Sequence, residues 1–246
     1  MSRNYWTTEY FSQPTETELK KNVQNTQKKA VKKGKELHPI IVTGRAITKS
    51  WWGNAWCNNL ERYADFESRI DRGRRYVRSG TVVDLQIEKG RVTARVQGSR
   101  RLPYKVEVRI SPLSEEKCQR IIDRCTQKIA NIEQFINGSF PDEMKELFES
   151  RDGLFPEPKE IGFICSCPDW ALMCKHVAAA LYGVGVRLDD DPLLFFELRG
   201  IDINRFIDVT LASKVDTMLE NALLAETTSS RILSGSSDLT GLFGVL

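Results

Sequence analysis

The stretch ICSCPDWALMCKH, residues 164–176, gathers three of the chain's six cysteines and one of its two histidines. Their spacing is Cys165-x-Cys167-x6-Cys174-x-His176. Three thiolates and one imidazole form a donor set that Zn²⁺ binds in a tetrahedron. We therefore expect one zinc ion, held by Cys165, Cys167, Cys174 and His176.

The same spacing predicts the local structure around the ion. Residues i and i+2 of an extended segment point to one side, so Cys165 and Cys167 can both reach an ion from the end of a strand in IGFIC. Pro168 then stops the strand pairing. Cys174 and His176 must lie at the irregular first turn of the next helix, because deeper in a helix they would point in nearly opposite directions. The sequence predicts a strand, a turn and a helix around one ion.

Four protein ligands close such a site, which favours a structural zinc over a catalytic one. Two alternatives compete with a zinc site. A disulfide between neighbouring cysteines is disfavoured where thiols stay reduced. A nucleophilic Cys174 with His176 as its base would leave Cys165 and Cys167 without a role. Lys175, between two ligands, would offset part of the site's negative charge.

The rest of the chain predicts an α+β fold. Apolar and polar residues alternate in 81–87, 91–96 and 104–110, which is typical of a half-buried antiparallel sheet. Ser50 begins a helix whose Trp52 and Trp56 we assign to the core rather than to base stacking. A long helix from Ser114 to Gly138 packs with the sheet and carries Cys118 and Cys125 on its apolar stripe. An alanine-rich helix is expected from His176 to Gly183, a short one from Pro192, and a last one over 204–225.

Charge is unevenly distributed between the two halves of the chain. Residues 1–109 hold 23 Lys and Arg against 11 Asp and Glu, whereas residues 110–246 hold 13 against 22. A basic half suggests an anionic partner such as nucleic acid, the alternative being a solvated surface without a partner. Residues 69–80 read as a basic loop or strand edge around Tyr76, and GSRRLP as an exposed bend. The candidate nucleic-acid contacts are Arg72, Arg74, Arg75, Arg78, Arg100 and Arg101.

Several classes of protein are not expected. No apolar run reaches the roughly 18 residues that a membrane span needs, and the N-terminus lacks the hydrophobic stretch of a signal peptide. We expect a cytoplasmic protein, nucleoid-associated if it binds DNA. The sequence has no carboxylate cluster spaced for two metals, no glycine-rich phosphate loop and no Ser–His arrangement, so we expect neither an enzyme nor a small-molecule substrate.

The zinc pattern, with a strand before it and an alanine-rich helix after it, resembles the SWIM zinc finger. The segments WWGNAWCNNLE, RGRRYVRSGTV, VQGSRRLPYKV, DDDPLLFFELRG and the terminal LFG are similar to bacterial SWIM proteins encoded beside SNF2-type helicases. The resemblance covers most of residues 44–246. It implies a ββα fold for the finger, a role in binding DNA or protein, an SNF2-type ATPase or another protein complex as partner, and no catalysis.

The expected organisation has five parts: a basic arm (1–43), a basic α+β domain (44–155), the zinc finger (156–186), C-terminal helices (187–225) and a flexible tail (226–246). The lysine-rich part of the arm is either a mobile or solvated segment or a phosphate contact. The tail ends in an apolar patch that we treat as a candidate docking peptide for a protein partner, through Leu239, Leu242 and Phe243; the alternative is a tail that folds back on the core. Two functions remain open: an accessory protein that binds nucleic acid, or an adaptor between proteins without DNA contact.

Overall fold

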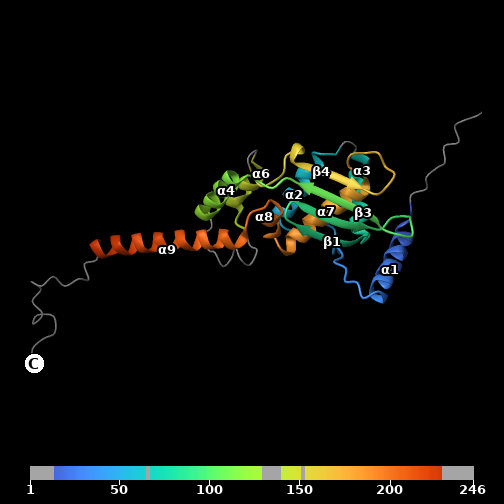
Figure 1. The fold of residues 1–246 in the computed structure, drawn as a ribbon, viewed down its shortest axis with the longest axis horizontal. Helices are drawn as coiled ribbons and strands as arrows, with labels where there is room; N and C mark the ends of the chain where they lie inside the picture. Colours follow the sequence, from blue (N-terminus) through green and yellow to red (C-terminus); the bar gives the residue numbers. More distant parts are fainter. Residues whose placement is uncertain (1–13, 65–66, 129–139, 151–152, 229–246) are drawn as a thin grey trace, which may run out of the picture.

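The computed structural model describes residues 14–64, 67–128, 140–150 and 153–228. The expected α+β fold is confirmed: a four-stranded antiparallel sheet is packed with helices, and further helices follow towards the C-terminus (Figure 1). The strands lie in the order β1-β2-β3-β4. They are β1 (Val82–Glu88), β2 (Arg91–Val96), β3 (Tyr104–Ile110) and β4 (Ile161–Cys165).

The sheet has one apolar and one polar face, because side chains alternate along each strand. Val92 pairs with Val108, which in turn pairs with Phe163 of β4. The side chains of Val92 and Val108 are buried. Gly90, at a φ of 70°, turns the chain from β1 into β2. The polar residues between the buried positions face away from the core.

Helix α7 (Lys175–Asp190) is the central helix and covers the apolar face of the sheet. It also packs against α2 (Trp51–Glu61) and α3 (Glu67–Arg78). The prediction that this helix ends at Gly183 is wrong. Gly183 and Gly185 lie inside it at crowded positions: a β-carbon would come within 3.0 Å of Leu85 at the first and within 2.9 Å of Cys57 Sγ at the second. Close packing there offsets the low helix propensity of glycine.

Residues 69–80 are not the loop or strand edge that we expected, because most of them belong to α3. Ile70, Gly73, Tyr76 and Val77 are buried on one side of this helix. Their spacing of three and four residues is that of an amphipathic helix. The arginines of the segment therefore occupy a helix surface.

Residues of the N-terminal arm form α1 (Glu16–Lys32), which begins with a capping box between Thr15 and Glu18. Leu19 and Val23 are buried, and buried Thr26 donates a hydrogen bond to Gln97 Oε1 at 2.7 Å. The helical part of the arm is therefore packed against the rest of the molecule on one side.

The tryptophan cluster lies in the core, as expected. Trp56 is 1% exposed and donates from Nε1 to the carbonyl of Leu181 at 2.9 Å. Trp51 and Trp52 are half-buried and contact each other edge to face. Around them lie the 3₁₀ segment η1 (Asp142–Met144), α6 (Lys145–Glu149) and α8 (Leu194–Leu198).

Between β3 and β4 the chain forms α4 (Glu115–Lys128), η1, α6 and η2 (Pro158–Glu160). Cys118 and Cys125 are buried, as expected. The expected end of the long helix at Gly138 lies outside the described residues. Arg199 is fully buried; it donates to the carbonyl of Ser111 at 2.7 Å and to Glu160 at 3.1 Å.

The last helix, α9 (Ile203–Thr228), begins and ends close to the expected range. It contacts α4 and extends away from the sheet (Figure 1). The candidate docking residues Leu239, Leu242 and Phe243 lie outside the described residues. No helix in the described part of the chain has both the length and the hydropathy to cross a membrane.

Candidate metal centre

The four residues expected as metal ligands meet where β4 ends and α7 begins. β4 ends at Cys165, and Cys174 is the N-cap of α7 with extended backbone angles. His176 follows in the first turn of that helix. The ligand atoms of Cys165, Cys167, Cys174 and His176 all lie within 4.8 Å of one another, so this Cys3His cluster could hold one metal ion.

The imidazole of His176 presents Nδ1 to the sulfurs. Nδ1 lies 3.9 Å from Cys165 Sγ and 3.9 Å from Cys174 Sγ. A tetrahedral zinc would separate a sulfur and a nitrogen ligand by about 3.6 Å, from its usual bond lengths. The cluster is thus close to the size of a zinc site, with Nδ1 as the ligand atom of the histidine.

Two aromatic rings fix the orientation of His176. Tyr104 stacks on the imidazole with 4.1 Å between ring centroids, and Tyr76 meets it edge to face at 5.5 Å. The ring is only 2% exposed. Burial lowers the pKa of His176, which favours the neutral form that a metal requires.

The far side of the imidazole is crowded. A β-carbon at Gly98 would lie 3.3 Å from His176 Nε2 and 2.8 Å from Tyr104 Cε2. Nε2 is buried and has no hydrogen-bond partner in the part of the chain that the structure describes. Gly98 therefore lets the loop between β2 and β3 close over the ring.

The three thiols affect one another's ionisation. The hydrogen bond from the Cys165 thiol lowers the pKa of Cys174 to about 4. That hydrogen bond raises the pKa of Cys165, while burial raises the pKa of Cys167. Three thiolates this close together repel, and a divalent cation between them would remove the repulsion. The donor set therefore fits a thiolate-binding metal such as zinc.

The segment between the second and third cysteines, residues 166–173, is tied to its surroundings on two sides. Asp169 pairs with Arg69 of α3, with Oδ2 and Nε 3.1 Å apart and Oδ1 and Nη2 3.2 Å apart. Ser166 and Lys105 exchange hydrogen bonds of 2.9 and 3.0 Å, which continue the pairing of β4 with β3. The Arg69–Asp169 pair could not be predicted, since nothing in the sequence relates residues 100 positions apart.

Lys175 lies close to this cluster, but its charge is directed to an aromatic ring. Its Nζ is 5.9 Å from the centroid of Tyr76, the ring that meets His176 edge to face. Burial is the main cause of the lowered pKa of His176, and the charge of Lys175 adds to it, so this cation acts on the site.

The six candidate arginines come from two parts of the chain, α3 and the loop between β2 and β3. On α3, Arg74 pairs with Glu61 at 2.6 Å and with Asp71 at 3.0 Å, so it is engaged within the protein. Arg72 is half-buried, Arg75 is exposed, and exposed Arg78 donates to the carbonyl of Arg45.

The other two arginines lie on the loop between β2 and β3. Arg100 and Arg101 are exposed there, and Arg100 lies 5.3 Å over the ring of Tyr104. Because Tyr104 stacks on His176, Arg100 lies near the metal centre.

Comparisons with known proteins give one homologue of unknown role. The chain is 31% identical over 176 residues to a protein of Mycobacterium tuberculosis (strain ATCC 25618 / H37Rv) that carries the name Uncharacterized protein Rv2102. The match covers 71% of this chain and 63% of that protein, so the chain spans less than two thirds of its homologue. No protein-family model matches the chain, and no solved structure matches it.

Proposed function

We propose that the protein is a SWIM-type, zinc-binding accessory protein without catalytic activity, and that it binds nucleic acid. The observation that carries this proposal is the Cys3His cluster, with its four donor atoms within 4.8 Å of one another at the junction of a strand and a helix. Bound zinc supplies a fixed tetrahedral connection with no open coordination position. Cys165 and Cys167 hold it from the side of the sheet, and Cys174 and His176 from the side of α7.

Metal content tests the zinc part of the proposal. Protein purified without added metal should carry one zinc per chain by inductively coupled plasma mass spectrometry. His176→Ala and Cys174→Ser should each carry less than a tenth of that amount. Cys118→Ala is the matched control, because Cys118 is a buried cysteine outside the cluster, and it should keep the full stoichiometry. Absence of metal from the wild-type protein would refute the proposal.

The nucleic-acid part is supported by the excess of basic residues over residues 1–109 and by the exposure of Arg75, Arg78 and Arg101. Contacts of arginine and lysine with phosphates position a protein but carry little sequence preference. Affinity for oligonucleotides should therefore fall steeply with salt. Fluorescence anisotropy with labelled single-stranded and duplex DNA and RNA tests this part. Failure to bind any of them at low salt would refute it.

A second candidate, a protein adaptor, is favoured by one observation. Trp170 and Leu172, between the second and third cysteines, are 80% and 64% exposed. Tryptophan is among the side chains that most commonly anchor protein interfaces, so Trp170 is the candidate anchor. The resemblance to SWIM proteins makes an SNF2-type ATPase the partner that we propose.

An affinity pull-down from native cells, read by mass spectrometry, discriminates the candidates. Recovery of an SNF2-type ATPase, lost on Trp170→Ala, supports the partner proposal. Nucleic acid binding without recovery of that ATPase refutes the partner and leaves the nucleic-acid function. Recovery of another complex by a protein that binds no nucleic acid favours the adaptor.

A further inference from the structure

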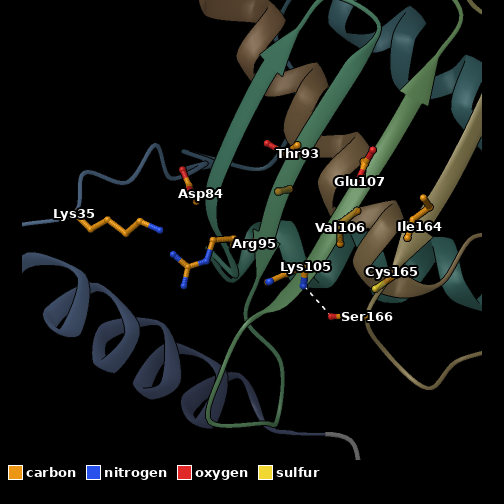
Figure 2. Close-up of a pocket in the computed structure, with 11 residues that line it drawn as sticks. Lys35, Asp84, Thr93, Arg95, Lys105, Val106, Glu107, Ile164, Cys165 and Ser166 are labelled. Carbon is orange, nitrogen blue, oxygen red and sulfur yellow. Dashed lines mark hydrogen bonds between the residues drawn. The ribbon is translucent and has the colours of Figure 1, made fainter. Parts of the chain in front are cut away.

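The polar face of the sheet carries a basic recess of about 640 Å³ that adjoins the metal centre. We call it the sheet recess; it is lined mainly by residues of β2, β3 and β4 and by Lys35. Figure 2 shows it on the side of the sheet away from α7, with the chain around Lys35 at one edge. Its volume lies in the range of known ligand sites.

Three cations in the sheet recess are available to a ligand. Figure 2 shows the nitrogen ends of Lys35, Arg95 and Lys105 gathered at one end of it. Within the described residues, none of these three side chains forms an ion pair or a side-chain hydrogen bond. Lys35 and Lys105 are exposed and Arg95 is half-buried. Three cations close together, against two carboxylates in the same lining, are characteristic of a site for an anion.

The two carboxylates of the recess already have partners. Asp84 accepts a hydrogen bond from the backbone N–H of His38 at 3.1 Å. Glu107 pairs with Arg109 Nε at 2.8 Å. The charge of Glu107 is therefore offset by Arg109, and the three cations outnumber the remaining carboxylate of Asp84, so the recess favours an anionic ligand.

The position of Lys35 is fixed by the residues that follow it. The N–H of Leu85 in β1 donates to His38 C=O at 2.9 Å, and the N–H of Ile40 donates to Val82 C=O at 3.0 Å. Residues 38–40 thus run along β1 and hold the preceding segment at the edge of the sheet.

We infer that the sheet recess binds the phosphodiester backbone of a single-stranded nucleic acid. This inference rests on the proposed nucleic-acid function and assigns its site. Lys35, Arg95 and Lys105 contact phosphates, and Ile164, which is 48% exposed in the recess, packs against a base or a sugar. A single strand can enter a concave recess with its backbone, whereas the phosphates of a duplex lie on a convex surface.

The test uses the zinc-loaded full chain and a fluorescein-labelled oligothymidylate of about 15 nucleotides, a length within the range that single-strand sites cover. The variant is Arg95→Gln/Lys105→Gln. Its matched control is Lys89→Gln/Arg91→Gln, which removes the same charge at the opposite end of β2, where both residues are exposed. Anisotropy titrations at several salt concentrations give the affinity and its salt dependence.

The recess variant should lose affinity on the order of tenfold, and its log–log salt slope should be shallower by about 1.4, or 0.7 for each lost phosphate contact. The control should stay within about twofold of the wild-type protein, since its residues lie away from the recess. Circular dichroism and zinc content should be unchanged in both. If the double variant does not fold, Lys35→Gln, on an exposed segment outside the sheet, should still weaken binding and reduce the slope.

Each other outcome overturns the inference in a recognisable way. If the wild-type protein binds the oligonucleotide and both double variants bind equally well, the recess is not the site, and the proposed function stands with Arg100 and Arg101 as the next residues to test. If the wild-type protein binds no nucleic acid at low salt, the proposed function fails as well. If a duplex of the same length binds as tightly and depends equally on Arg95 and Lys105, the ligand is not a single strand.

Discussion

The side chain of His176 shows what one position contributes to the metal centre. Spacing alone identifies it as a candidate ligand together with three cysteines. The choice of Nδ1 as the ligand atom depends on Tyr104, Tyr76 and Gly98, which come from other elements and surround the ring. No local pattern could reveal this enclosure, because it forms only when the loop between β2 and β3 closes over α7.

Gly98→Val should weaken zinc binding without removing a ligand. A side chain there would collide with Tyr104 and crowd His176 Nε2, tilting the imidazole away from the sulfurs. Loss of such supporting contacts typically costs 10- to 100-fold in metal affinity. Competition with a chromophoric chelator measures the change.

The control for this variant is Gly162→Val in β4, where a β-carbon would meet no atom within 4 Å. It should bind zinc as the wild-type protein does. Equal affinities for both variants would show that the packing on the ring does not matter.

The five cysteines other than Cys174 should divide into two reactivity classes. Burial raises the pKa of Cys57 to about 12, and Cys118 and Cys125 are also buried, so these thiols should resist iodoacetamide at pH 8. Cys165 and Cys167 are only half-buried and should react once a chelator removes the metal. Peptide mass spectrometry before and after chelation reads both classes.

The direction of the pKa shift at Cys57 also predicts an alkaline effect. The unfolded thiol ionises near 9 and the folded one near 12, so stability falls as the pH rises between these values. Rapid alkylation of Cys57 in the folded, metal-loaded protein would contradict its assignment to the core.

At the scale of elements, the contact between α3 and α7 helps to position the metal centre. Gly73 permits it: a β-carbon there would lie 2.5 Å from Ala178 Cβ. The Arg69–Asp169 pair extends the contact to the segment between the cysteines. The orientation of α7, and with it the position of His176, therefore depends on a small residue in a helix where we expected a loop or strand edge.

Gly73→Val should separate α3 from α7 and lower the free energy of unfolding by about 1–3 kcal/mol, the usual cost of overpacking a core. Arg75→Val is the matched control, since Arg75 is exposed on the same helix. It should change stability by less than about 0.5 kcal/mol. Urea denaturation measures both values, and equal stability of the two variants would show that the helices can separate at no cost.

The strands could be predicted because their side chains alternate with a period of two over an entire element. Helix α3 could not be recognised in the same way, because only Ile70, Tyr76 and Val77 mark its buried side among five arginines, and Gly73 is more typical of a loop. The pairing of β4 with β3 could not be predicted from local sequence patterns either, because residues 111–160 separate the two strands. Sequence spacing predicts which residues surround the metal, while tertiary contacts decide what surrounds those residues.

At the scale of the whole molecule, the metal centre belongs to the main core. β4 is the fourth strand of the sheet, and α7 packs against the sheet, α2 and α3. The sheet and α7 thus span the boundary at residues 155–156 that the sequence suggested. The loss of a metal at their junction should therefore destabilise parts of the core far from its ligands.

A chelator should lower the midpoint of thermal unfolding of the entire core in a single transition, because the ion binds only the folded state. Acidification should have the same effect, since protons compete with the metal for thiolates and imidazole. Circular dichroism measures the transition, and hydrogen exchange should show lost protection in β3, β4 and α7. Lost protection limited to residues 166–173 would contradict the prediction.

The separation of β3 from β4 in the sequence has a consequence for biosynthesis. A ribosome makes β1 to β3 first and must add residues 111–160 before β4 appears, and Cys174 and His176 come later still. Until then β3 is an open sheet edge, the kind of surface through which nascent chains aggregate. The last strand and the ion thus complete the sheet late in translation. Zinc starvation should therefore lower the yield of newly made soluble protein before it weakens binding by protein that has already folded.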